Sequence, residues 1–496
     1  QYQWPLSWDV IIHIQYAMVY IKYGLVLTDP LLNAPFGQQI GYPPLFHFLL
    51  AFLGMVTQID LFQIARALQP FLAMFIVLSV SYVARKFYGS IAGISAGFLI
   101  LSSVLLGRIL LPIPENLALI FLPLSVYLYY RSIKDNRLKY AFFSGILFVT
   151  VILTHQVASL ILLLIISVIS LVELVVYRDI HVLKNYGTFL LLLVCLVVVG
   201  VIGLLLWQPD IIYSIYNQGI TSVTGLFILS SNRPLNIRGY LDIGYLVLIF
   251  AITGIIFSLK KLKRKDLFIL TWILLMFLIS IAYWFGINVI SYRLLVYLLL
   301  PLSIMGGFGL SEIYQNLKSY ERFSLDKFAW IFLVMVFIIS IVSGILTVED
   351  PDLAVFAVEN QYGKVEIAPP STSMVDLAAW FNSHGNKSKS IMTNNLFTGT
   401  YLATVTGMPI HYGFEDFNKN ITQSAFNDAQ IGYLVLDKRL SLSENSETLQ
   451  LIPVKSEFYP LVYFSKPISS NLDELLPDFI KVVYENQDYI VCQIIE

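Results

Sequence analysis

Four sets of ionisable residues in this sequence could carry out chemistry, and each stands close to a long apolar stretch. The first is Asp9 with His13 four residues later, a spacing that places both side chains on one face of a helix. A carboxylate beside an imidazole suits a divalent cation or a general base. The alternative is a purely structural role, as an aspartate at the start of a helix that interacts favourably with the helix dipole.

The second set is Glu115 with Asn116, in the short segment LLPIPEN between two apolar stretches. An acidic group so near hydrocarbon is costly unless it is paired or coordinated. The alternative is a glutamate in the first turn of a helix, solvated at the membrane interface. Asp9 and Glu115 together would form an oxygen-rich cation site of the kind that Mg²⁺ or Mn²⁺ prefers.

The third and fourth sets are cationic or titratable groups at the ends of apolar stretches. Arg293 opens the stretch SYRLLVYLLLP, where a guanidinium can hold a phosphate bidentately or simply extend to the lipid headgroups. Arg238 is a further cation that could bind phosphate, and Arg108 and Arg233 are further cationic groups on the same face. His155, in LTHQ, could contact a ligand or satisfy a hydrogen bond between helices.

The composition shows which class of protein must position these residues. Hydrophobic residues make up 57% of the 496 residues and charged residues 13%, with a mean hydropathy of +0.75, whereas soluble proteins are about 25% charged. The sequence has no Walker loop, no GxSxG, no CxxC pair and no HExxH. These values exclude a soluble enzyme, a disordered chain and a nucleic-acid binder, and they predict a polytopic α-helical membrane protein.

Apolar stretches long enough to cross a bilayer divide the first 348 residues. We expect about ten spans, at roughly 62–83, 91–108, 116–130, 141–154, 158–177, 187–207, 241–259, 267–285, 292–313 and 328–348. The chain begins at Gln1 in polar, aromatic sequence, which we interpret as the start of a fragment.

The distribution of positive charge orients these spans. One set of alternate loops holds 16 basic residues: Arg85, Lys86, Arg131, Lys134, Arg137, Lys139, Arg178, Lys184, Lys260, Lys261, Lys263, Arg264, Lys265, Lys318, Arg322 and Lys327. The opposite set holds only Arg233 and Arg238 within its loops, with Arg108 and Arg293 at span edges on that side. The positive-inside rule therefore places the 16 residues in the cytoplasm and the C-terminal tail outside the cell, in a protein integral to the plasma membrane.

Three regions follow from this pattern. Residues 43–58, PPLFHFLLAFLGMVTQ, are either a further short span or part of an external segment on the membrane surface, and we favour the second interpretation. Residues 1–61 are then a first external loop with interfacial helices, and 62–348 the transmembrane bundle. Residues 349–496 alternate polar and short apolar stretches, which predicts an external α/β domain with a helix after Ser371 and a C-terminal hairpin.

Several stretches resemble the catalytic subunits of oligosaccharyltransferases, notably the archaeal single-subunit enzymes that use dolichyl-phosphate-linked glycans. The stretches are TDPLLNAPFGQQIGYPPLFHFLLAFLG after Asp9, SYVARKFYGSIAGISAGFLILSS, LLPIPENLALIFLPL and SYRLLVYLLLPLSIMGGFGL. The resemblance covers most of residues 1–348. It implies the GT-C class of membrane glycosyltransferases, and it implies that a further span precedes the loop of Asp9.

By this resemblance Asp9 matches the first-loop carboxylate, Glu115 the second acidic motif, and Arg293 the arginine that contacts the donor phosphate. The sequence departs from the family at two places. The second motif usually carries an aspartate, and the WWDYG motif that recognises the acceptor is missing, with TNNLFTGTYL in its place. These departures bear on sequon recognition and leave the wider class intact.

The sequence thus favours an enzyme that transfers a sugar or oligosaccharide from a polyprenyl phosphate or pyrophosphate to a protein or lipid acceptor on the external face. A metal on Asp9 and Glu115 would stabilise charge on the leaving phosphate, and direct displacement would invert the anomeric carbon. Two alternatives remain open at this point. A transporter or lipid flippase needs ionisable groups deep in the bundle, and a non-catalytic anchor needs no acidic rim.

Overall fold

The computed structural model describes residues 4–207, 209, 235–260, 262–287, 289–318, 325–418, 421–443, 448–455 and 459–495. These residues form two compact units. The first unit joins residues 1–41 and 47–67 to the C-terminal residues 354–496, and the second contains residues 42–46 and 68–353. The N-terminal loop and the C-terminal domain are therefore parts of one unit, although most of the chain separates them.

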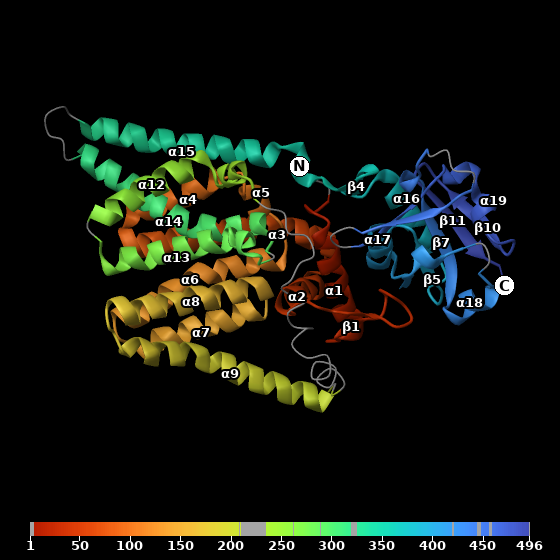
Figure 1. The fold of residues 1–496 in the computed structure, drawn as a ribbon, viewed down its shortest axis with the longest axis horizontal. Helices are drawn as coiled ribbons and strands as arrows, with labels where there is room; N and C mark the ends of the chain where they lie inside the picture. Colours follow the sequence, from red (N-terminus) through yellow and green to blue (C-terminus); the bar gives the residue numbers. More distant parts are fainter. Residues whose placement is uncertain are drawn as a thin grey trace. The chain divides into compact units, whose positions relative to one another are not determined.

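The second unit is a helical bundle (Figure 1). Its elements are α3 (Leu61–Tyr88, which begins in the first unit), α4 (Ser90–Leu101), α5 (Leu106–Ile109), α6 (Pro114–Lys134), α7 (Leu138–Ile152), α8 (Gln156–Val176), α9 (His181–Trp207), η1 (Ile237–Ile243), α12 (Tyr245–Lys260), α13 (Arg264–Ser280), η2 (Ala282–Phe285), α14 (Ser291–Lys318) and α15 (Leu325–Glu349). Helix α14 packs against α4, α12, α13 and α15, while α6 packs against α7 and α8.

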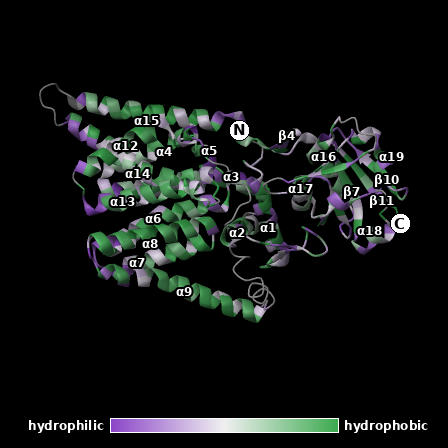
Figure 2. Ribbon diagram, viewed as in Figure 1, coloured by the Kyte–Doolittle hydropathy of each residue, from purple (hydrophilic) through white to green (hydrophobic). Residues whose placement is uncertain are grey.

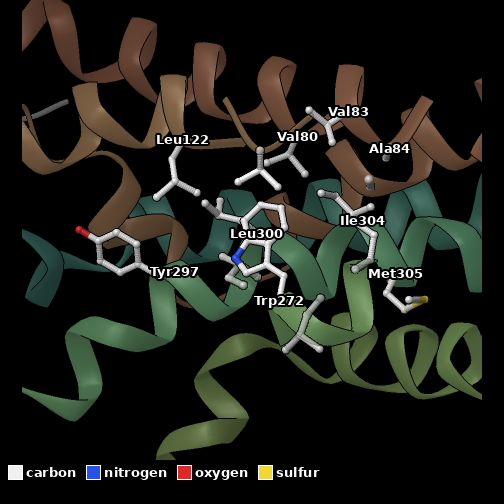
Figure 3. Packing of buried hydrophobic residues seen from close by; sticks show 14 of the residues in the cluster. Val80, Val83, Ala84, Leu122, Trp272, Tyr297, Leu300, Ile304 and Met305 are labelled. Atoms are coloured by element: carbon white, nitrogen blue, oxygen red, sulfur yellow. The ribbon is translucent and has the colours of Figure 1, made fainter. Parts of the chain in front are cut away.

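One core of buried apolar side chains runs through this bundle. Trp272 of α13 is fully buried and lies among side chains of the neighbouring helices, among them Leu122 of α6 and Leu300 of α14 (Figure 3). Close helix packing depends on small residues: a Cβ at Gly309 of α14 would lie 2.2 Å from the carbonyl oxygen of Phe250 in α12. Small residues of this kind let membrane helices approach each other closely.

Hydrophobic residues cover the bundle helices along most of their length (Figure 2). All ten stretches expected to span are largely helical, although 91–108 is divided between α4 and α5. Among the described residues six helices are long and apolar enough to cross a membrane, or seven if the bent pair of η1 and α12, with 89° between them, is one span. Helices α4 and α7 are apolar but shorter. The bundle and its hydropathy indicate an integral membrane protein, and the count of ten crossings stays a prediction.

The C-terminal part of the first unit is built on a five-stranded sheet in the order β10-β11-β7-β5-β6. Strands β5 (Ser390–Thr393), β6 (Ile410–His411) and β7 (Ile431–Asp437) are parallel, and the hairpin of β10 (Ile480–Glu485) and β11 (Tyr489–Ile494) extends the sheet antiparallel to β7. Helix α17 (Leu396–Thr406) connects β5 to β6, and α18 (Gln423–Asp428) leads into β7.

Smaller elements complete this domain: η4 (Pro351–Ala354), β3 (Phe356–Asn360), β4 (Gly363–Ala368), α16 (Thr372–His384), η5 (Phe414–Asp416), η6 (Lys438–Leu440), β8 (Leu451–Val454), β9 (Leu461–Phe464), η7 (Ile468–Ser470) and α19 (Leu472–Leu475). The predicted helix after Ser371 is α16. The Ser371 hydroxyl caps it by accepting a hydrogen bond from the N–H of Met374 at 3.2 Å. The α/β character of this region and its C-terminal hairpin agree with the sequence analysis.

The N-terminal loop belongs to the same core as this domain. Its elements are α1 (Asp9–Tyr23), the short strands β1 (Thr28–Asp29) and β2 (Gln38–Gln39), and α2 (Leu45–Thr57), which ends in this unit. Helix α1 packs against α17, and the rings of Trp8 and Phe397 meet at 5.2 Å. The N–H of Ile410 donates to the carbonyl oxygen of Leu31 at 2.7 Å. With 13 residues, α2 is shorter than the about 20 residues that a spanning helix needs.

Candidate functional site

Glu115 is a buried carboxylate at the start of α6 in the second unit. The helix begins at Pro114, whose fixed φ suits the first helical position, and Glu115 in the first turn interacts favourably with the helix dipole. Glu115 is only 4% exposed. The carboxylate forms an ion pair with the guanidinium of Arg108, which is itself mostly buried. This pairing meets the requirement that a buried charge have a partner.

Asn116 positions the two members of this ion pair. Its side-chain amide is fully buried and donates to the carbonyl oxygens of Arg108 at 2.8 Å, Ile109 at 3.0 Å and Leu111 at 2.7 Å. These carbonyls belong to the end of α5 and the turn after it, where Arg108 and Leu111 also accept backbone hydrogen bonds from the N–H groups of Leu111 and Ile113. Asn116 therefore fixes the turn that brings Arg108 opposite Glu115, a positioning role that the spacing of the residues did not indicate.

Two other segments bring further groups to Glu115. Arg293, in the first turn of α14, and His155, directly before α8, both act electrostatically on the carboxylate. The hydroxyl of Tyr297, one turn after Arg293, lies next to the carboxylate as well. The ring of Tyr292 lies 5.7 Å from the guanidinium carbon of Arg108. Residues near 108–116, 155 and 292–297 thus converge, and we call this set the Glu115 cluster.

The environment of His155 favours its neutral form. Burial lowers the pKa of His155; the carboxylate of Glu115 opposes this effect, and the guanidiniums of Arg108 and Arg293 add to it. Its Nδ1 accepts a hydrogen bond from the N–H of Ala158 at 3.2 Å, so the neutral ring carries its proton on Nε2. The Glu115 cluster therefore combines two guanidiniums with one carboxylate, and this balance attracts an anion.

Asp9 and His13 lie in the first unit, at the start and the middle of α1. Asp9 is half-buried in the first helical turn. His13 is buried, and its Nδ1 lies 3.0 Å from Nε2 of His47, which Tyr16 approaches edge-on at 5.3 Å. The structure therefore pairs His13 with His47. Because Asp9 and Glu115 belong to different units, a cation shared between them stays a prediction.

Arg238 and the predicted metal site are the remaining candidates from the sequence. Arg238 is exposed in η1, and its backbone N–H donates to the side chain of Asn236 at 3.4 Å. The charges that act on Glu115 come from Arg108, His155 and Arg293. Within the described residues, no group of three or more His, Cys, Asp and Glu side chains could hold a metal ion.

The segment in place of the WWDYG motif is occupied by internal hydrogen bonds. The side chain of Asn395 caps α17 by accepting from the N–H of Phe397 at 3.1 Å, and its amide donates to Asp437 at 2.8 Å. Asp437 is fully buried and bound by Arg439 at 2.6 Å. These polar groups lie at the carboxyl ends of the parallel strands β5 and β7, and they stabilise the domain from within.

Sequence reasoning missed two residues of interest. Tyr297 carries no signal, because a tyrosine in an apolar helix is common. Asp29 is fully buried in β1, where it accepts hydrogen bonds from the side chain of Gln15 at 3.0 Å and the N–H of Leu31 at 2.8 Å. Arg108 was visible only as a further cation, although it is the one charge in the apolar stretch LLGRILLPIP directly before Glu115.

Comparison with known proteins identifies the fold. No protein-family model and no curated protein matches the sequence. Among solved structures, the oligosaccharyltransferase of Archaeoglobus fulgidus in its apo form matches with a TM-score of 0.61 and 14% identity, over 88% of this chain and 66% of that chain. The chain therefore spans slightly less than two thirds of that enzyme. A structure of the same enzyme is a complex with Zn and sulfate.

A second similar structure covers nearly the whole chain. ArnT from Cupriavidus metallidurans bound to undecaprenyl phosphate matches with a TM-score of 0.61 and 10% identity, over 98% of this chain and 94% of that chain. The oligosaccharyltransferase AglB from Archaeoglobus fulgidus, in complex with an inhibitory peptide and a dolichol-phosphate, matches with a TM-score of 0.56 and 15% identity. At these identities the likeness concerns the fold, and this chain has the fold of GT-C glycosyltransferases.

Proposed function

We propose that this protein is a polyprenyl-phosphate-dependent glycosyltransferase, which moves a sugar or oligosaccharide from the lipid phosphate to a protein or lipid acceptor on the external face of the membrane. The observation that carries the proposal is the Glu115 cluster, an anion-attracting set of partly or fully buried charges in α5 and at the starts of α6 and α14. It occurs in the fold of structures that hold undecaprenyl phosphate and dolichol-phosphate.

The external location rests on the distribution of charge in the sequence. The basic loops, among them the loop of Arg131 and Lys134 at the end of α6, lie at the helix ends remote from Glu115. The positive-inside rule then places Glu115 and Arg293 at the outer side of the membrane. A lipid-linked donor in the outer leaflet would reach them laterally.

The guanidiniums are the groups that would stabilise the reaction. As the bond between the anomeric carbon and the phosphate oxygen breaks, its electron pair leaves with the phosphate, and Arg293 and Arg108 would bind the growing negative charge. Glu115 would hold Arg108 in position through their ion pair. The acceptor atom forms the new bond to the anomeric carbon from the opposite side and inverts it, and its proton passes to a carboxylate, for which we propose Asp9.

The charges of the Glu115 cluster suit a phosphate better than they suit a divalent cation. Arg108 already neutralises the carboxylate, and Arg293 adds a second positive charge beside it, so a cation there would meet repulsion. Mg²⁺ or Mn²⁺ at Asp9 and Glu115 therefore stays a prediction, and the proposed mechanism assigns no step to a metal.

The proposal is tested with the purified full-length protein, a polyprenyl-phosphate-linked radioactive sugar and membrane extract as the source of acceptor. Because removal of one preorganised contact to developing charge typically slows a reaction about 10²–10³-fold, we expect Arg293→Gln to reduce sugar transfer by that factor. Arg137→Gln, an exposed arginine in a basic loop, is the matched control and should leave transfer unchanged.

Two outcomes would contradict the proposal. Full transfer activity in Arg293→Gln and Asp9→Ala would show that the Glu115 cluster and the first loop do not serve catalysis. Movement of the labelled lipid across liposomes without any sugar transfer would identify a flippase instead.

A further inference from the structure

A surface groove lies between α3 and α4, and none of its lining residues belongs to the Glu115 cluster. It has a volume of about 640 Å³, and eleven described residues line it. Leu78, Tyr82 and Ile94 are among them and are 45–54% exposed. Most of the lining is apolar, so a chain of hydrocarbon fits it. We call this feature the α3–α4 groove.

Two glycines make the floor of the groove. A Cβ at Gly97 would lie 2.4 Å from Oγ of Ser81, and a Cβ at Gly93 would lie 2.6 Å from Cβ of Arg85. The two helices therefore contact each other through their backbones, and the larger side chains stand on either side of this contact. The groove is a consequence of the GISAG stretch at 93–97.

The length of the groove matches one leaflet of a bilayer. Its lining on α4 runs from Ser90 to Leu101, which is about 16 Å at the rise of an α-helix. Half of the hydrocarbon core of a bilayer is about 15 Å. A lipid tail that starts at the Ser90 end would therefore finish near the bilayer midplane.

One end of the groove carries a positive charge. Arg85 is the single charged residue among the eleven described lining residues, and it is exposed at the junction of α3 and α4. Neighbouring lysines have other partners: Lys86 lies over the ring of Tyr82 at 5.2 Å, and Lys265 donates to the carbonyl oxygen of Phe87 at 2.6 Å. Arg85 is thus the cation that an anionic headgroup at this end would meet.

We propose that the α3–α4 groove binds one anionic glycerophospholipid, with an acyl chain along Tyr82, Ile94 and Phe98 and the phosphate on Arg85. The headgroup site is distinct from the proposed donor site. Arg85 lies near the end of α3 and Ser90 at the start of α4, whereas Arg108 lies in α5, after the end of α4. The lipid belongs to the leaflet beside the basic loops. Clusters of basic residues at this side of membrane proteins typically bind anionic lipids.

Native mass spectrometry of the full-length protein tests this proposal, with palmitoyl-oleoyl phosphatidylglycerol and the corresponding phosphatidylcholine added separately. We expect the wild type to retain the phosphatidylglycerol more tightly. Arg85→Gln should weaken phosphatidylglycerol binding about fivefold, since one basic residue near the membrane surface contributes about that factor. Phosphatidylcholine should lose less, because its choline ammonium already offsets the charge of its phosphate. Ile94→Trp, which fills the groove, should weaken binding of both lipids.

Two matched variants control for general effects. Arg137→Gln removes an exposed basic residue elsewhere, and Ile252→Trp enlarges an exposed side chain on α12; neither should alter lipid binding. The proposal is overturned by Arg85→Gln that binds phosphatidylglycerol as the wild type does, or by an equal loss in Arg137→Gln. Displacement of the phosphatidylglycerol by undecaprenyl phosphate would assign the groove to the donor lipid. A shift from dimer to monomer in Ile94→Trp would assign it to a second copy.

Discussion

At the scale of single residues, the ion pair of Arg108 and Glu115 should be strongly coupled. Removing one partner of a buried pair leaves an uncompensated charge and destabilises a protein by about 3–5 kcal/mol, whereas replacing both partners can be nearly neutral. We therefore expect Glu115→Gln and Arg108→Gln each to lower the melting temperature, and the double variant to recover much of the loss. A thermal-shift assay on the purified protein measures all three.

The half-buried pair of Arg131 and Asp135 at the end of α6 is the control for this cycle. Its side chains are 33% and 25% exposed, against 14% and 5% for the pair of Arg108 and Glu115, and ion pairs that water reaches contribute about 1 kcal/mol or less. Arg131→Gln and Asp135→Asn should therefore change the melting temperature little. Additive losses in the Arg108 and Glu115 double variant would contradict the assigned pairing.

Asp29 should make the stability of the first unit depend on pH. Burial raises the pKa of Asp29, and the hydrogen bonds from Gln15 and Leu31 oppose this effect only in part. A carboxyl whose pKa is raised on folding stabilises the folded state below its unfolded pKa and loses that contribution as the pH rises through the folded value. At neutral pH the protein therefore holds an unfavourable buried charge at this position.

Asp29→Asn should relieve this charge. The asparagine keeps an oxygen for the N–H of Leu31, and its amide can donate to Oε1 of Gln15, a buried atom without a hydrogen-bond partner in the described structure. We expect a melting temperature about 2 °C above wild type at pH 7.5 and a difference that shrinks towards pH 4.5. A variant less stable than wild type at both pH values would disprove this account.

The sequence predicts which residues are suited to chemistry better than it predicts which residues they contact. Glu115, Arg293 and His155 are rare ionisable groups next to hydrocarbon, so composition alone makes them candidates, and the structure brings all three together. The hydrogen bonds of Asn116 to the turn after α5 depend on backbone carbonyls, which leave no trace in the sequence. The pairing of His13 with His47 depends on how α1 and α2 pack, which spacing within one helix cannot reveal.

At the scale of elements, the contact of α12 with α14 should depend on glycine. A Cβ at Gly309 would lie 2.2 Å from the carbonyl oxygen of Phe250 and 2.6 Å from the backbone nitrogen of Gly254. Because backbone atoms cannot move aside cheaply, we expect Gly309→Ala to destabilise the bundle by about 1–3 kcal/mol. Thermal unfolding of the purified protein, followed by fluorescence, measures this loss.

Helix α9 supplies the matched glycine. At Gly200 a Cβ would meet no atom within 4 Å, and alanine is the better helix former. Gly200→Ala should therefore leave stability unchanged or raise it slightly. If both variants lose stability alike, the effect comes from glycine in general and the close contact of α12 with α14 is not its cause.

Elements with a local cause are those that the sequence predicts well. The helix α16 follows from a serine cap and an apolar face, and β7 follows from a short apolar run, YLVLD. The ten apolar stretches are helical because hydrocarbon leaves the backbone no other way to satisfy its hydrogen bonds. At the break between α4 and α5, the N–H of Leu105 and the hydroxyl of Ser103 donate to the carbonyl oxygen of Asp242, a tertiary contact that composition does not report. The bend between η1 and α12 lies at Gly244, whose φ is +102°.

At the scale of the whole molecule, hydropathy divides the chain into an apolar and a polar region but does not show which polar segments associate. The sequence assigns residues 1–61 to a loop of their own. In the structure residues 1–41 share a core with residues 354–496. Leu31 and Leu32 of the loop are buried in the same apolar cluster as Phe397 and Ile410, a contact between segments more than 350 residues apart.

Trp8 should be the residue on which this association depends most. Its side chain is fully buried, and its ring meets that of Phe397 on α17 at 5.2 Å; truncation of a buried tryptophan to alanine costs about 3–5 kcal/mol. Local opening of the loop would then release Ile410, whose N–H donates to Leu31 and whose carbonyl oxygen accepts from Ala34. We expect Trp8→Ala to speed hydrogen exchange at residues 396–411.

The matched variant is Trp380→Ala, on α16 of the same unit. The Trp380 ring stacks on Tyr484 of β10 at 5.4 Å, so its loss should speed exchange in the hairpin of β10 and β11 and leave residues 396–411 protected. Trp8→Ala should show the reverse pattern. Equal acceleration of both segments in both variants would mean that the unit unfolds as a whole, and unchanged exchange at residues 396–411 in Trp8→Ala would show that the C-terminal domain folds without the N-terminal loop.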